Sequence, residues 1–140
     1  MFEGGRTEVS VEHLPVDLLR PRDLIGRWTL TLDSFVHETG TLYVVGESIE
    51  DPRAEPGAMP LLTALAASVV ERGRRMAERS SSGRLDPPMT LVLDDVAAVA
   101  PLPQVPELLA TGADRGMPTL ALLRSREQAR SRWPHAELPG

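Results

Sequence analysis

The sequence predicts an α/β fold, a short parallel β-sheet with helices on both faces. Short apolar segments alternate with segments of helical periodicity, in the order β, α, β, α, β, α. The central apolar segment, residues 89–93, is typical of a strand that is covered on both faces. With 140 residues, the chain has the size of a single domain.

The first half of the chain contains the strongest helix prediction. Residues 1–32 show no clear period and are expected to form an irregular N-terminal segment, although residues 29–32 alternate as a short strand does. Asp33 is a candidate helix N-cap, and residues 41–45 are β-branched and aromatic, which predicts a strand. In residues 60–79 apolar side chains recur at spacings of three and four, which predicts a helix.

The second half continues the alternation after the central strand. A short helix is expected near residues 107–111, a third strand at 118–123 and a last helix at 125–132. The predicted α/β domain therefore spans residues 33–134, and residues 135–140 form a tail.

The composition excludes several kinds of chemistry. All 15 basic residues are arginine, and the chain has no lysine, cysteine or asparagine. A P-loop lysine, a Schiff base, a disulfide framework and a thiol nucleophile are therefore excluded. The three histidines form no metal-binding pattern. The longest apolar stretch, 60–70, is too short to span a bilayer, and no signal peptide is recognised, so a cytoplasmic protein is expected.

Two carboxylates, Asp94 and Asp95, directly follow the central strand. Parallel α/β sheets bind ligands beyond the carboxyl ends of their strands. An apolar strand that runs into two carboxylates is typical of a Walker B element, in which the first holds Mg²⁺ through water and the second orients or deprotonates an attacking water. The pattern alone favours another interpretation, in which both aspartates are turn or capping residues that end a core strand.

A wider pattern surrounds these aspartates. A proline-rich bend, a short helix, an Arg-Gly turn and a third strand follow them, and an Asp-Ser-Phe triplet and a Gly-Thr-Leu-Tyr segment precede them. Over about residues 30–134 the chain resembles the C-terminal half of TraG/TraD-type coupling proteins of conjugation and type IV secretion, in their actinobacterial branch. The segments that carry the resemblance are 33–35, 40–43, 83–95, 100–103, 106–109 and 114–116.

The resemblance implies a partial RecA-like P-loop NTPase fold and a hexameric ATPase ring that moves DNA and uses Mg-ATP. It also implies a recognition region for TraM, a DNA-bound accessory protein. By position, Asp94 corresponds to the Walker B aspartate that holds Mg²⁺ through water, and Asp95 to a residue that is usually glutamate. Arg115 corresponds to an arginine that faces a neighbouring subunit's nucleotide, and Arg124 stands where glutamine is usual.

The departures from the family pattern concern the same residues. Asp95 is one methylene shorter than glutamate, and misplacement by about 1 Å can cost on the order of 100-fold in rate. Arg124 adds a charge that could bind phosphate but could not accept a hydrogen bond. Asp114 could pair with Arg115 and weaken the effect of its positive charge. No glycine-rich P-loop is present in the sequence, so the P-loop half of the fold is absent. The isolated chain is therefore expected to have no cofactor and no ATPase activity.

Three functional hypotheses remain. The first is a partial coupling ATPase that retains the Walker B half. The second is a non-catalytic module that binds a protein of the DNA-transfer machinery or coupling-protein subunits. Such a module could also associate with itself, and its partners could place it at the inner face of the membrane. The third is a decayed fragment. DNA contact is expected to be indirect, because the net charge is -5 and residues 124–132 offer only four arginines. Trp28 and Trp133 are expected to pack or contact a partner.

Overall fold

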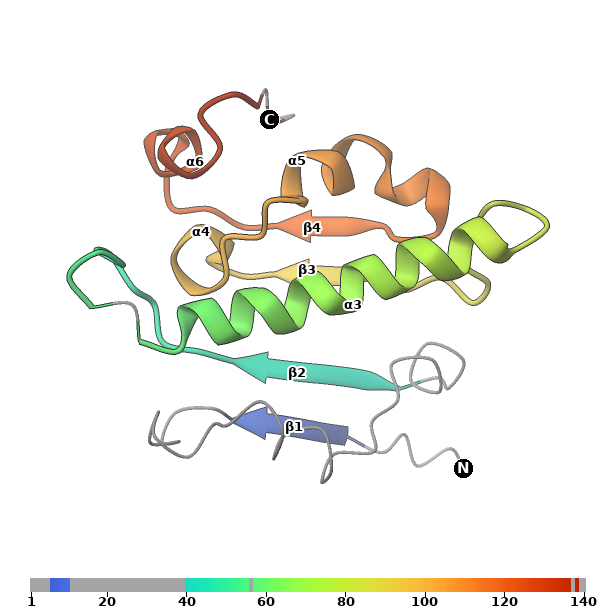
Figure 1. Cartoon of the computed structure of the whole chain (residues 1–140), viewed down its shortest axis with the longest axis horizontal. Coiled ribbons are helices and arrows are strands. Elements are labelled where there is room, and N and C mark those ends of the chain that lie inside the picture. The colour runs from blue at the N-terminus through green and yellow to red at the C-terminus, as the bar shows by residue number, and fades with distance from the viewer. Residues whose placement is uncertain (1–5, 11–39, 56, 137, 139–140) are drawn as a thin grey trace. The chain divides into compact units, whose positions relative to one another are not determined.

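The computed structural model describes residues 6–10, 40–55, 57–136 and 138 (Figure 1). The chain divides into two compact units, Met1–Gly46 and Glu47–Gly140, each of which is described by itself. This division falls later in the chain than the predicted boundary after residue 32, which itself lies outside the described residues.

The first unit contains two parallel strands, β1 (Arg6–Ser10) and β2 (Thr41–Val45), with Arg6 opposite Thr41 and Ser10 opposite Val45. Strand β2 is the predicted strand. Strand β1 differs from the irregular structure expected there, because its five residues include only one apolar side chain and so show no alternation. The strand expected at 29–32 and the cap at Asp33 lie outside the described residues.

The second unit contains the long helix α3 (Met59–Arg79) and the parallel strands β3 (Leu91–Leu93) and β4 (Thr119–Ala121). All three were predicted, and both strands are shorter than the apolar segments that contain them. Helix α3 begins with a proline in its first turn, where the missing amide costs no hydrogen bond. The unit is thus an α/β arrangement with a short parallel sheet.

Several short helices complete the second unit. Helix α4 (Val96–Val99) follows β3 and was not predicted. Helix α5 (Val105–Glu107), the π-helical turn η2 (Leu108–Gly112) and the 3₁₀ turn η3 (Ala113–Arg115) follow one another directly and are called the helical arm below. The last helix, α6 (Arg126–Arg132), confirms the predicted helix, and the Ser125 side chain caps it.

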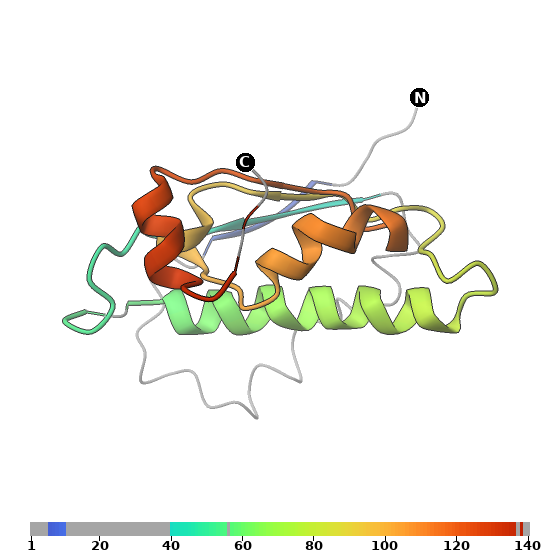
Figure 2. The same cartoon turned by 90° about the horizontal axis from the view of Figure 1, so that it is seen from above.

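Helix α3, the helical arm and α6 lie on one side of β3 and β4 (Figure 2). On the other face Val92 and Leu120, which are opposite each other in the register, are 65% and 57% exposed. The prediction of helices on both faces is therefore wrong for the described part of this unit. The uninterrupted apolar sequence of β3 indicated two covered faces, but a three-residue strand is too short for its pattern to distinguish one covered face from two.

The core of the second unit joins α4, the helical arm and α6. Trp133 is 7% exposed, and its indole Nε1 donates a hydrogen bond of 2.8 Å to the carbonyl of the fully buried Leu102. This confirms the packing role expected for this tryptophan. The buried members of the cluster are Val96, Ala97, Leu102, Val105, Ala129 and Trp133.

Close backbone contacts hold the amino ends of β3 and β4. The Leu85 amide donates to the Arg115 carbonyl and the Met89 amide to the Gly116 carbonyl, both at 2.9 Å. Gly116 has φ +76°, and a Cβ atom there would lie 2.6 Å from the Leu85 carbonyl oxygen. Only glycine fits this position without strain.

Candidate site at the carboxyl ends of β3 and β4

The two predicted aspartates leave β3 in different directions. The exposure pattern of the strand continues through them, with Val92 and Asp94 exposed and Asp95 partly buried. Asp94 makes no hydrogen bond or ion pair with another described residue. The Asp95 side chain is 19% exposed and has several partners. The two carboxylates therefore do not act as a pair.

The backbone of Asp95 turns the chain from β3 into α4. Its φ and ψ angles, 46° and 37°, lie in the left-handed region, which aspartate tolerates better than most residues. Its carbonyl accepts hydrogen bonds from the amides of Ala98 and Val99 at 2.9 and 3.0 Å. Asp95 thus occupies the N-cap position of α4, as the turn interpretation expected, but its side chain makes no cap hydrogen bond.

The Asp95 side chain instead binds residues from distant parts of the sequence. Its Oδ2 lies 2.7 Å from Nη2 of Arg124 and accepts a hydrogen bond of 2.8 Å from the Ser48 hydroxyl. The same Nη2 donates to the Ser48 oxygen at 2.8 Å, and Nη1 of Arg124 pairs with Glu50. We call Ser48, Glu50, Asp95 and Arg124 the carboxyl-end cluster.

This arrangement limits what Asp95 and Arg124 can do chemically. Asp95 Oδ2 is occupied by two donors, and its Oδ1 is buried without a partner in the described residues. Both terminal nitrogens of Arg124 are also occupied. In this conformation neither side chain is free to activate water or bind phosphate.

The sequence singled out Asp95 and Arg124 separately, and the structure brings them together. Ser48 and Glu50 were missed. Ser48 is 47 positions from Asp95 and 76 from Arg124, so no local spacing indicates these contacts. Asp95 and Arg124 both depart from the family pattern and carry opposite charges, which was the one signal in the sequence for a contact between them.

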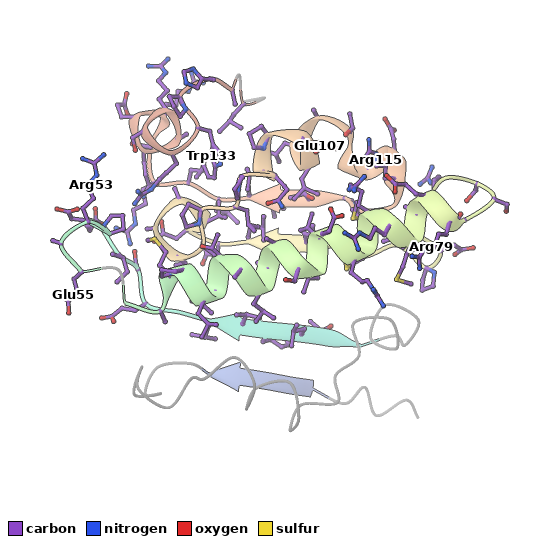
Figure 3. The ribbon with its side chains drawn as sticks, in the orientation of Figure 1. Arg53, Glu55, Arg79, Glu107, Arg115 and Trp133 are labelled. Atoms are coloured by element: carbon purple, nitrogen blue, oxygen red, sulfur yellow. The ribbon has the colours of Figure 1, made fainter. Side chains whose placement is uncertain are left out.

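Arg115 lies elsewhere. It precedes β4 and so lies at the amino ends of the strands (Figure 3), whereas Asp94 and Asp95 follow the carboxyl end of β3. Its Nη1 pairs with Glu107 Oε1 of the helical arm at 3.1 Å. The expected partner, Asp114, makes no ion pair with Arg115, so that expectation is wrong: the 3₁₀ turn directs the two neighbouring side chains apart. Within one chain, Arg115 cannot act together with the aspartates.

A small cavity of about 60 Å³ lies between α3 and the helical arm. Its size corresponds to about two water molecules, so it does not fit a nucleotide. Gln104, whose Oε1 is buried without a partner among the described residues, lines this cavity. The residues that line the cavity are Val70, Glu71, Arg74, Gln104, Glu107, Leu108, Thr111, Gly112, Arg115 and Met117.

Charged side chains of α3 form a local network beside this cavity. Glu71 accepts hydrogen bonds from Arg74 at 3.0 Å and from Arg75 at 2.8 Å. These two arginines lower the pKa of Glu71 to about 2. All three side chains are at least about one third exposed, so the network belongs to the surface.

The arginine cluster at residues 124–132 is partly used inside the domain. Arg124 belongs to the carboxyl-end cluster, and Nε of Arg132 donates to the Ala97 carbonyl at 2.8 Å. Arg126 and Arg130 remain as exposed cations on α6. Two cations give a weaker phosphate-binding surface than the four that the sequence counted.

The residues present do not fit a complete Mg-ATP site. Asp94 offers one accessible carboxylate, which is enough for a water-mediated contact to Mg²⁺. The sequence supplies neither a glycine-rich loop nor a lysine for the β- and γ-phosphates. Among the described residues, no group of three or more histidine, aspartate or glutamate side chains could hold a metal ion.

Fold and site together define a small α/β domain with polar side chains gathered at the carboxyl ends of its strands. Residues 88–138 match the family model described as the TraM recognition site of TraD and TraG. This match confirms the resemblance over β3, the helical arm, β4 and α6. Comparisons with curated proteins and with solved structures gave no match. In the described part of the chain, no helix is both long and apolar enough to cross a membrane.

Proposed function

We propose that the chain serves in conjugative DNA transfer as a protein-recognition module and does not act as an ATPase by itself. One observation carries this proposal: residues 88–138 are similar to the segment of TraD and TraG that is described as the TraM recognition site. That segment includes both strands of the second unit, so the recognition surface is sought on them.

The carboxyl-end cluster supports a non-catalytic role. A Walker B element needs a second carboxylate that is free to orient water. Asp95 is instead bound to Arg124 and Ser48. The two departures from the family pattern, aspartate for glutamate and arginine for glutamine, compensate each other, because the longer cation reaches the shorter carboxylate. A partial RecA-like fold remains part of this proposal.

The exposed face of β3 and β4 is the proposed recognition surface. Val92, Leu120 and Leu122 are 65%, 57% and 44% exposed, and all three lie in the matched segment. Strands of a parallel sheet are normally covered on both faces. We propose that a TraM-type accessory protein covers these side chains, and that DNA is contacted only through that protein.

Binding to the TraM-type protein of the same conjugative element tests this proposal. We expect a complex with the purified chain in isothermal titration calorimetry, and a loss of affinity of at least about tenfold in Leu120→Ser, because a buried leucine is worth about 1.5–3 kcal/mol. Leu61→Ser is the matched control, since Leu61 is 36% exposed on α3 and lies outside the matched segment. Absence of binding, or equal losses in both variants, would overturn the proposal.

One observation favours the partial coupling ATPase as a second candidate. Asp94 is exposed at the carboxyl end of β3. From there it could contact a nucleotide that is bound to the P-loop of another chain. Under the first proposal the purified chain does not hydrolyse ATP. Phosphate release that disappears in Asp94→Ala would favour the second candidate. Association with coupling-protein subunits at the inner face of the membrane belongs to both candidates.

A further inference from the structure

Three consecutive residues cross the carboxyl ends of β3 and β4, and each is bound there. The Ser48 hydroxyl donates to Asp95 at 2.8 Å. The Ile49 amide donates to the Ala98 carbonyl at 2.9 Å. Glu50 pairs with Arg124. This edge, where parallel α/β sheets bind their ligands, is therefore occupied by the chain itself.

We propose that residues 48–50 form a strap that closes the carboxyl end of the sheet and opens without unfolding the domain. An external ligand or partner of Asp95 then has to displace the strap. The inference concerns only contacts within the second unit, so it does not depend on the proposed function.

The contacts of the strap are of the kind that open locally. The Glu50 and Arg124 side chains are 77% and 51% exposed, and ion pairs so exposed contribute little stability. A single backbone hydrogen bond, from Ile49, joins the strap to α4. Segments with few buried contacts and exposed hydrogen bonds open with free energies far below that of global unfolding.

The turn after the strap keeps its own shape. The Asp51 carboxylate accepts a hydrogen bond from the Arg53 amide at 3.0 Å, and the Asp51 carbonyl accepts one from the Ala54 amide at 3.2 Å. These bonds are local, so they remain when residues 48–50 leave the edge. The turn can therefore stay intact while the strap opens.

Arg124 holds two of the three strap residues and is the point at which to test the proposal. We expect hydrogen exchange of the Ile49 amide in the full chain, followed by NMR at neutral pH, to accelerate on the order of tenfold in Arg124→Gln, because hydrogen bonds to charged groups are lost. Arg126→Gln is the matched control, since Arg126 is exposed two residues further on and makes no hydrogen bond or ion pair with the strap. Its exchange is expected to match that of the wild type.

Two further measurements separate strap opening from unfolding. The Leu91 amide, which donates to the Pro118 carbonyl at 2.9 Å, reports on the strands, and in the wild type its protection factor is expected to exceed that of the Ile49 amide by at least about tenfold. The milder change Glu50→Gln removes only one ion pair and is expected to accelerate Ile49 by about two- to fivefold. Unchanged exchange of Ile49 in both variants, or equal protection of Ile49 and Leu91 in the wild type, would overturn the proposal.

Discussion

Different interactions stabilise the two ends of the β3–β4 pair. At the amino end, backbone atoms touch directly and glycines make room for them, as at Gly116 against Leu85. At the carboxyl end, charged and hydroxyl groups meet across long stretches of sequence, as Asp95 and Arg124 do. The difference indicates that the amino end is coupled to folding of the whole unit, whereas the carboxyl end can be altered or opened locally.

Gly116→Ala should produce the largest effect. A Cβ atom there would lie 2.6 Å and 2.8 Å from the carbonyl oxygen and amide nitrogen of Leu85, and neither backbone atom can rotate away. We expect a loss of about 3 kcal/mol or more in the free energy of unfolding, or failure to fold. Urea denaturation followed by circular dichroism measures it.

Gly83→Ala is the matched control for that change. Gly83 also has a positive φ, +69°, but a Cβ atom there meets no atom within 4 Å. Only the left-handed backbone penalty remains, which is about 1 kcal/mol. If both variants lost the same free energy, close packing at the amino end would not be what distinguishes the two ends.

A double-mutant cycle on Asp95 and Arg124 should give an intermediate effect. Arg124→Gln is expected to lower the free energy of unfolding, measured by urea denaturation, by about 1–2 kcal/mol, because it leaves a partly buried carboxylate without its cation. The coupling energy with Asp95→Asn is expected to be about 1 kcal/mol. The coupling energy is modest because the Arg124 side chain is 51% exposed, so solvent weakens its interaction with Asp95. Asparagine keeps the left-handed backbone, so the cycle isolates the charge. A coupling energy near zero would contradict the assigned cluster.

The smallest effect concerns Glu71 and pH. Because arginines lower the pKa of Glu71 from 4.5 to about 2, its contribution to stability is complete above pH 4.5 and is lost as the pH falls toward 2. We expect the urea midpoint to fall between pH 5 and about 2.5, and Glu71→Gln to make this fall shallower. Glu55→Gln, which removes an exposed carboxylate that has no ion pair with another described residue, serves as the control. Identical pH profiles for both variants would refute the assignment.

Local patterns predicted the helices and strands well, because periodicity and capping depend on neighbouring residues. Helices α3 and α6 and strands β2, β3 and β4 lie where the sequence placed them. The prediction that helices cover both faces of the sheet was wrong, because a short strand made only of apolar residues gives no sign of which face is exposed to solvent. The candidate site was predicted as separate residues. Its assembly depends on Ser48 and Arg124 meeting across 76 positions, which no spacing reveals.

The left-handed backbone at Asp95 restricts which residues can stand there. Aspartate, asparagine and glycine adopt this conformation readily, whereas glutamate would add a penalty of about 1 kcal/mol. The backbone conformation alone therefore favours aspartate over glutamate at this position, without any requirement from catalysis. For proteins built like this one, an aspartate pair at a strand end is weak grounds for assigning nucleotide hydrolysis, and the side chain that faces the second aspartate is the more informative position to inspect.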